Sequence, residues 1–138
     1  MRWLIDSGVL IEGERGNTSF IPWLEGQKEN ATADVVRCEF LLGLHAVTDT
    51  AKRRRGEQFY RDRIAGLSSL ANEPEDFETA GRIAGEARRL GRGKRSVVDG
   101  LLAAIALRTG ATVATRNEMD FKAMGCPCAD PLLPNARG

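Results

Sequence analysis

Two short apolar stretches, residues 2–5 and 111–115, have the character of buried strands and are separated by a long run with helical periodicity. Strands separated by long helices need crossover connections, which favour parallel pairing in a sheet covered by helices. The predicted fold class is therefore α/β, with a central, mostly parallel sheet flanked by helices. In such sheets ligand sites lie beyond the carboxyl ends of the strands, where Asp6 and residues 115–120 are expected.

Helices are predicted from the spacing of apolar residues and from capping residues. One is expected to begin after Thr32 as its N-cap, with Val36 and Phe40 on its buried face. The expected helices cover residues 22–26, 32–47, 50–70, 74–91, 96–110 and a short segment after 117. No repeat or linker interrupts the pattern, so residues 1–138 are expected to form one domain.

The composition is that of an ordinary globular protein, with 42% hydrophobic and 28% charged residues. The sequence has neither an apolar run long enough to cross a membrane nor the pattern of a signal peptide, so a cytoplasmic location is expected. The three cysteines are expected to be free thiols, because an odd number builds no disulfide framework. Cys126 and Cys128 also lack a second pair of soft ligands for zinc.

The formal net charge is only +1, but the basic residues gather in two segments. This segregation fits two interpretations, namely solvated helix faces or a surface that follows the phosphates of a nucleic acid. The candidates for RNA contact are Lys52, Arg53, Arg54, Arg55, Arg92, Lys94 and Arg95.

Four carboxylates stand in apolar surroundings although they are far apart in the sequence. Asp6 ends the first predicted strand, and Glu39 and Asp99 lie on the apolar faces of their helices. Asp120 follows the second strand. Each has a structural explanation as well. Asp6 could cap a helix and Asp99 could complete a capping box, while Asp120 could be a first-turn acid of a helix capped by Asn117 and Glu39 could pair with a buried arginine. Their shared placement at strand ends and inward helix faces favours one cluster.

A cluster of acids stays ionised only when cations compensate it, because like charges raise one another's pKa. Oxygen ligands without histidine or cysteine favour Mg²⁺, for which Mn²⁺ can substitute. Such an ion orients water for attack on a phosphodiester and neutralises charge on the leaving oxygen. The sequence therefore predicts hydrolysis of a phosphate ester, with the basic segments holding a polyanion.

The sequence lacks the residues that other hydrolytic and transfer mechanisms require. The only histidine, His45, follows Glu39 by six residues, which is about 120° around a helix and therefore off the face of the cluster. This disfavours a two-histidine ribonuclease and a Ser-His-Asp hydrolase. No glycine-rich phosphate loop occurs in the sequence, which disfavours nucleotide-dependent transfer.

Four blocks of the sequence, LIDSGVLI, VVRCEFLLG, VVDGLLAAIAL and TVATRNEMDF, resemble the PIN-domain ribonucleases, and most closely the VapC toxins of bacterial toxin–antitoxin modules. The resemblance implies a PIN-like three-layer fold and a Mg²⁺-dependent endoribonuclease that cleaves tRNA or rRNA and so stops translation. It also implies a homodimer and a cognate VapB-type antitoxin, which commonly inserts a basic side chain among the acids.

Carried over residue by residue, the resemblance implies that Asp6, Glu39, Asp99 and Asp120 are the catalytic acids, and that Asp6, Asp99 and Asp120 bind metal. Supporting polar roles fall to Ser7, Thr115 and Asn117.

Two positions depart from the family pattern. Gly8 stands where family members often carry Asn, and Asn117 stands where other PIN domains have Asp. Asp120 or Glu118 could then supply the fourth acid, and one metal ion is expected more readily than two. Two other functions stay open: a non-catalytic PIN-like RNA-binding protein, and a receiver-like domain that uses Asp6 as phosphate acceptor.

Overall fold

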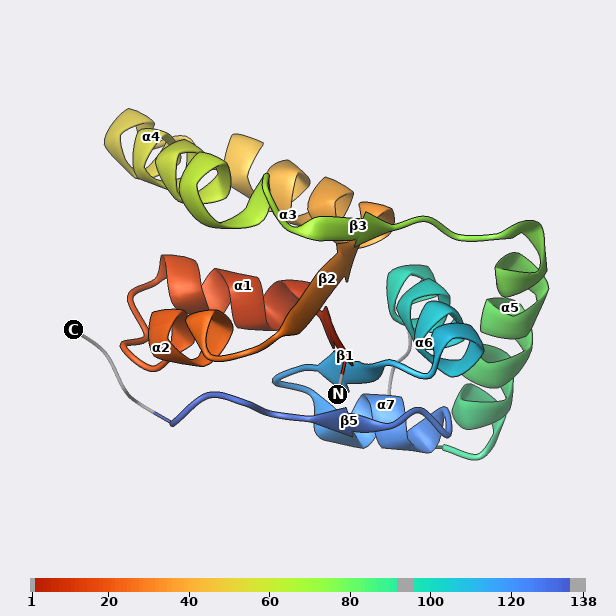
Figure 1. Ribbon diagram of the computed structural model, residues 1–138. Coiled ribbons are helices and arrows are strands. Elements are labelled where there is room, and N and C mark those ends of the chain that lie inside the picture. Colours follow the sequence, from red (N-terminus) through yellow and green to blue (C-terminus); the bar gives the residue numbers. More distant parts are fainter. Residues whose placement is uncertain (1, 92–95, 135–138) are drawn as a thin grey trace.

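The computed structural model describes residues 2–91 and 96–134. Its centre is a five-stranded sheet in which every pairing is parallel and the strand order is β3-β2-β1-β4-β5 (Figure 1). The strands are β1 (Arg2–Ile5), β2 (Glu29–Ala33), β3 (Ser68–Leu70), β4 (Thr112–Ala114) and β5 (Cys128–Ala129). The predicted α/β class with a parallel sheet is confirmed.

The central strand β1 determines where polar side chains meet. It pairs with β2 in the register Ile5↔Thr32 and with β4 in the register Ile5↔Ala114. The backbone N–H of Asp6 still donates to Ala114 O at 2.9 Å. Since the strands run in the same direction, Asp6 and Thr115 leave the sheet side by side at its carboxyl edge.

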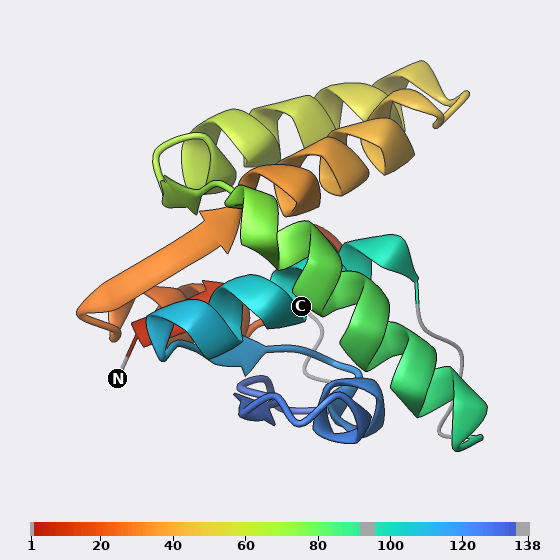
Figure 2. The ribbon, with the colours of Figure 1, turned by 90° about the vertical axis from the view of Figure 1, so that its right-hand side faces the viewer.

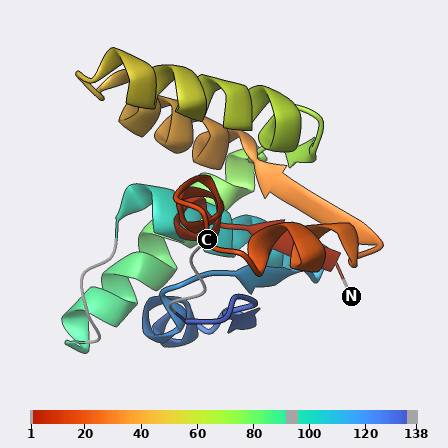
Figure 3. The ribbon, with the colours of Figure 1, turned by 90° about the vertical axis from the view of Figure 1, so that its left-hand side faces the viewer.

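Helices cover both faces of this sheet. Figures 1 and 3 show α1 and α2 on one side, and Figure 2 shows α5 and α6 on the other, while α3 and α4 form a hairpin at the β3 end. The helices are α1 (Ser7–Glu14), α2 (Phe20–Glu25), α3 (Asp34–His45), α4 (Thr50–Phe59) with its π-helical continuation η1 (Tyr60–Ile64), α5 (Pro74–Arg89), α6 (Val97–Thr109) and α7 (Glu118–Ala123). Across the described ranges, none of these helices has the length and apolarity that a membrane span requires.

The prediction that Thr32 caps a helix is wrong, because Thr32 lies in strand β2. Residues 29–31 lack the β-branched and aromatic side chains that mark a strand in the sequence. Pairing with β1 overrides this weak preference, and the Thr32 hydroxyl donates to Ile5 O at 2.9 Å. The helix predicted over 32–47 is therefore shorter at both ends, and Val47 lies beyond it.

The helix predicted over 50–70 is also too long, since it ends at Ile64 and is followed by the edge strand β3. Arg37 of α3 stabilises this change of direction. Its guanidinium donates to three acceptors of the segment: Ile64 O, Leu67 O and Ser69 Oγ. The two-residue strand β5 is likewise not predicted by the sequence. These short edge strands depend on contacts with distant residues.

Helix α6 confirms the prediction over 96–110. Ser96 caps its start, and Gly110 ends it with a φ of 77°. The run Gly100–Ala106 is buried without interruption, because α6 lies between the sheet and α5. A Cβ on Gly100 would lie 3.1 Å from Ala80 O of α5, so glycine permits the close approach of the two helices.

Candidate metal and active site

Asp6 lies at the carboxyl end of β1 and is also the N-cap of α1. It is 7% exposed. Its Oδ1 accepts a hydrogen bond from Ser7 N at 2.8 Å, and its Oδ2 accepts one from the Thr115 hydroxyl at 2.9 Å. Thr115 Oγ1 in turn accepts from Asn117 N at 2.9 Å. The predicted capping role of Asp6 is confirmed, and its hydrogen-bond partners are neutral groups.

Glu39 reaches the same edge of the sheet from α3. The Ser7 hydroxyl donates to Glu39 Oε1, while the Ser7 backbone N–H donates to Asp6. Within the described part of the chain no arginine pairs with Glu39, so the buried ion pair considered for this residue is not found there. Ser7 therefore joins two of the predicted acids and fixes how they lie relative to each other.

Asp99 enters the cluster from the first turn of α6. Its backbone N–H donates to Ser96 Oγ at 3.0 Å, as helix capping predicts. Burial and the charges of Glu39 and Asp120 raise the pKa of Asp99, although hydrogen bonds from Ser96 act in the opposite direction. Asp99 thus takes part in the cap and also lies within the field of two other acids.

The pKa of Asp6 shows the strongest effect of this crowding. Its pKa is raised to about 6, chiefly by burial and also by the charges of Asp99 and Glu39, while hydrogen bonds from Thr115 and Ser7 act in the opposite direction. Folding has therefore brought Asp6, Glu39 and Asp99 into one electrostatic neighbourhood. Among residues 2–91 and 96–134, no lysine or arginine forms an ion pair with these three acids.

Of the two candidates for the fourth acid, Asp120 is the one directed toward the cluster. The Asn117 amide donates to the Asp120 carboxylate, and the charge of Asp120 contributes to the raised pKa of Asp99. Glu118 instead accepts from Asp130 N at 3.0 Å, beside β5. The geometry favours Asp120.

Metal binding has support from the donor chemistry but not from a preformed cage. In residues 2–91 and 96–134, no three or more His, Cys, Asp and Glu side chains are grouped so that they could hold an ion. The acids nevertheless present carboxylate oxygens only, which is the donor set that Mg²⁺ and Mn²⁺ prefer. A divalent cation would also offset the burial and the mutual repulsion that raise the pKa values of Asp6 and Asp99. The residues present fit such an ion.

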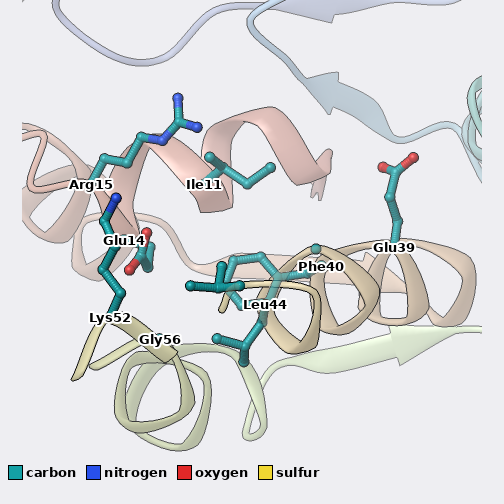
Figure 4. A pocket seen from close by; sticks show the side chains of 10 residues that line it. Ile11, Glu14, Arg15, Glu39, Phe40, Leu44, Lys52 and Gly56 are labelled. Atoms are coloured by element: carbon teal, nitrogen blue, oxygen red, sulfur yellow. The ribbon is translucent and has the colours of Figure 1, made fainter. Parts of the chain in front are cut away.

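A cavity of about 280 Å³ adjoins the acids between α1, α3 and α4. Figure 4 shows the Glu39 carboxylate at one end of this cavity and the side chains of Arg15 and Lys52 at the other. Its walls include the apolar side chains of Ile11 and Leu44. Lys52, one of the predicted RNA-binding residues, therefore faces a space that leads to Glu39.

The other predicted RNA-binding residues differ in their surroundings. Lys52, Arg54 and Arg55 are exposed on α4. Arg53 is partly buried, and its Nη1 donates to Val47 O at 2.7 Å, just beyond the end of α3, which gives it a structural role. Arg92, Lys94 and Arg95 lie outside the described residues.

One basic residue at this edge was not singled out from the sequence. Arg116 lies between Thr115 and Asn117, and its Nη1 donates to Asp130 Oδ1 at 3.3 Å. A Cβ on Gly8 would lie 3.7 Å from Arg116 Cβ and Cγ, so the stem of Arg116 packs beside the first turn of α1. The only signal for Arg116 in the sequence is its place inside the block TVATRNEMDF.

Comparison with known proteins gives a family match over most of the chain. A family model described as PIN domain matches residues 3–125. This range includes Asp6, Glu39, Asp99 and Asp120. No curated protein matches the chain in sequence.

Solved structures show the same fold at low sequence identity. FitAcB from Neisseria gonorrhoeae has a TM-score of 0.79 and 23% identity, over 94% of this chain and 97% of that one. DNA-bound VapBC from Salmonella typhimurium has a TM-score of 0.78 and 18% identity, over 95% and 98% of the two chains. A toxin–antitoxin complex from Klebsiella pneumoniae has a TM-score of 0.71 and 21% identity, again over 95% and 98%.

Proposed function

Because the chain belongs to the PIN-domain family, we propose that it is a metal-dependent endoribonuclease and the toxin of a toxin–antitoxin module. The resemblance to PIN domains is confirmed by the family match, and the fold is that of the VapBC and FitAcB structures. One observation carries the proposal of catalysis. Asp6 is buried without a basic hydrogen-bond partner, in the field of two further acids that raise its pKa.

Asp6, Asp99 and Asp120 are the proposed ligands of Mg²⁺ or Mn²⁺. When bound, such an ion lowers the pKa of water and neutralises charge on the phosphodiester. The protein orients two of the ligands through hydrogen bonds, since the Thr115 hydroxyl binds Asp6 and the Asn117 amide binds Asp120. These are the proposed supporting roles of Thr115 and Asn117.

Glu39 is the proposed acceptor of a proton from the attacking water. Its Oε1 already accepts the Ser7 hydroxyl, which leaves Oε2 for the water. Ser7 is thus a positioning residue, because it holds the Glu39 carboxylate at the cluster while its own backbone N–H holds Asp6.

The proposed substrate is tRNA or rRNA, whose cleavage would stop translation in the cytoplasm. The exposed residues Lys52, Arg54 and Arg55 on α4 support an RNA substrate, because such side chains neutralise phosphates irrespective of base sequence. Lys52 and Glu39 line opposite ends of one cavity, which supports a path for RNA between this basic surface and the acids.

The proposed partner is a VapB-type antitoxin. Structures of similar fold are described as VapBC and as a toxin–antitoxin complex, which supports such a partner for this chain. A basic side chain of the antitoxin placed among the acids would compete with the metal for the same oxygens. We further propose that residues 1–138 form a single PIN-like domain and that two copies form a homodimer.

The alternative function is RNA binding by a non-catalytic PIN-like protein. The family match leaves no support for the receiver-like alternative. The remaining two functions differ in their dependence on Asp99, because a binding module would tolerate its loss.

The test is cleavage of total cellular RNA by antitoxin-free protein in Mg²⁺ or Mn²⁺ and in EDTA. We expect discrete fragments that disappear with chelator and with Asp99→Asn, while the circular dichroism spectrum stays that of the parent. Asp120→Asn is expected to remove cleavage as well. Glu118→Gln is the matched control and should cleave like the parent. Equal cleavage by Asp99→Asn and the parent would refute the proposed acid cluster.

A further inference from the structure

Arg116 stands at the carboxyl edge of the sheet beside the acids, and the proposed mechanism assigns it no task. We infer that Arg116 binds a phosphate of the RNA substrate at the mouth of the acidic cluster. This inference rests on the proposed function, and it concerns how a polyanion is held next to a group of carboxylates.

The backbone on both sides of Arg116 is held firmly to the site. Thr115 N donates to Ala129 O at 3.0 Å, and the Thr115 hydroxyl donates to Asp6. Asn117 N donates back to Thr115 Oγ1 at 2.9 Å. The position from which Arg116 projects is therefore determined by the same hydrogen bonds that orient Asp6.

The stem of Arg116 has a defined course as well. It passes beside Gly8 in the first turn of α1, which is the helix that Asp6 caps. Its guanidinium then reaches Asp130, which directly follows β5. Arg116 thus contacts the first turn of α1 and the residue that follows β5, at the carboxyl edge of the sheet.

The guanidinium of Arg116 retains donors for a ligand, in contrast to two other arginines of the structure. Arg37 uses Nε, Nη1 and Nη2 for acceptors around β3, and Arg108 uses Nε and Nη2 for Asp76. Arg116 donates through Nη1 to Asp130 at 3.3 Å. An arginine carries five N–H donors, so one hydrogen bond leaves most of them for an incoming phosphate.

The ion pair with Asp130 is suited to exchange. Both side chains are 30% exposed, and a partly exposed ion pair is weak because water competes for each partner. A phosphate offers a guanidinium two parallel hydrogen bonds, which is a better match than the single contact to Asp130. Asp130 would therefore hold Arg116 in place and release it to RNA.

A cation at this position would reduce the repulsion between the acids and the RNA in the proposed reaction. The acids that raise the pKa of Asp6 also repel the phosphates of RNA. Lys52 of α4 lies at the opposite end of the cavity from Glu39, whereas Arg116 adjoins Asp6 through Thr115. Arg116 would offset this repulsion where the strand enters the site.

The experiment measures binding of a fluorescein-labelled, single-stranded RNA of mixed sequence, with Ca²⁺ in place of Mg²⁺ to slow cleavage. We expect Arg116→Gln to raise the Kd about tenfold and to lower the slope of log Kd against log salt by about one. Arg116→Lys should restore the slope but only part of the affinity, because lysine keeps the charge without the planar fork. The affinity for Mn²⁺ should stay that of the parent in both variants.

Asp130→Asn is the matched control, because it breaks the same ion pair and leaves Arg116 intact. We expect its RNA affinity to equal or exceed that of the parent. If Asp130→Asn lost affinity as Arg116→Gln does, the ion pair would be purely structural and the inference would be overturned. An unchanged Kd and salt slope in Arg116→Gln would overturn it too.

Cleavage in Mn²⁺ separates failure of this inference from failure of the proposed function. A parent protein that cleaves RNA, with an Arg116→Gln variant that binds equally well, would overturn only the inference. A parent that binds RNA without cleaving it would refute the nuclease, while the Kd of Arg116→Gln would still decide the role of Arg116. A parent that neither binds nor cleaves would refute both.

Discussion

Asp6 and Asp76 are both buried, at 7% and 2% exposure, yet their surroundings shift their pKa values in opposite directions. Asp76 lies in the first turn of α5 and accepts from Glu73 N at 2.8 Å. It also accepts from Arg108 Nε and Nη2, each at 3.0 Å. Burial raises the pKa of Asp76, but these donors outweigh it and hold the pKa below its usual range. In the part of the chain that the structure describes, no cation forms an ion pair with Asp6.

The difference separates a carboxylate that holds the fold together from one that is left available for a ligand. The charge of Asp76 is compensated within the chain, since Arg108 at the end of α6 reaches it across 32 positions. At the carboxyl edge of the sheet the described neighbours of Asp6 are neutral donors and further acids, so its charge is not compensated by the residues that the structure describes. Uncompensated burial is costly, and it is found where ligands bind.

The largest effect is expected from breaking the ion pair between Arg108 and Asp76. Arg108→Met leaves the Asp76 carboxylate buried without its cation, and we expect Tm to fall by about 10 °C. The matched control is Arg82→Met, which removes an exposed ion pair with Glu86 and should shift Tm by no more than about 2 °C. Thermal unfolding followed by circular dichroism measures both. Equal shifts would mean that the two ion pairs do not differ in importance.

The opposite sign is expected at Asp6. Asp6→Asn keeps a helix-capping side chain and removes the charge, so the free energy of unfolding in EDTA at pH 7.5 should rise by about 2 kcal/mol. RNA cleavage should disappear in the same variant, because the proposed metal ligand is lost. Urea unfolding and the cleavage assay check the two parts. A variant less stable than the parent would show that the carboxylate is already compensated in the folded chain.

A smaller effect is expected at the close contact between α5 and α6, the two helices that carry Asp76 and Arg108. Gly100→Ala would place a Cβ 3.1 Å from Ala80 O, a backbone atom that cannot turn aside, and we expect Tm to fall by about 5 °C. Gly85→Ala is the control on α5, where a Cβ meets nothing within 4 Å. It should raise Tm by a few degrees through helix propensity. A stable Gly100→Ala variant would show that the two helices can move apart without loss.

The smallest expected effect concerns pH: the amount by which Asp6→Asn exceeds the parent in free energy of unfolding should depend on it. The pKa of Asp6 rises from an ordinary value of 3.8 to about 6 in the folded protein, so the folded state binds the proton more tightly than the unfolded state does. The stability from that proton is present below pH 3.8 and is lost as the pH rises through about 6. The advantage of Asp6→Asn in EDTA should therefore grow by about 1 kcal/mol between pH 5 and pH 7.5. An advantage that shrinks over this interval would contradict the raised pKa.

The elements predicted correctly are those whose signals are local. Strand β1 and helix α6 carry continuous apolar runs, and the caps Ser96 and Gly110 mark the limits of α6. Strand β2 was missed because residues 29–31 have little strand preference and become a strand by pairing with β1. Strand β3 was missed because Arg37, far from it in the sequence, holds the chain there.

The same distinction applies to the candidate site. The apolar surroundings of Asp6, Glu39 and Asp99 indicated which acids turn inward, and the structure brings these three together. The sequence contains no local signal that Ser7 donates to Glu39, because the hydrogen bond spans 32 positions. It also gave no means to choose between Asp120 and Glu118, since that choice depends on which side of a single helical turn faces the cluster.

The hydrogen bond from Thr115 to Asp6 joins residues 109 positions apart, and this separation affects when the site can form during synthesis. Synthesis proceeds from the N-terminus, so Asp6 is made well before Thr115 and the neighbouring strand β4. Until β4 is available, β1 has one unpaired edge and the acids have no common framework. The proposed activity would therefore begin only when β1 and β4 have paired, and the proposed antitoxin would have to be present at that moment.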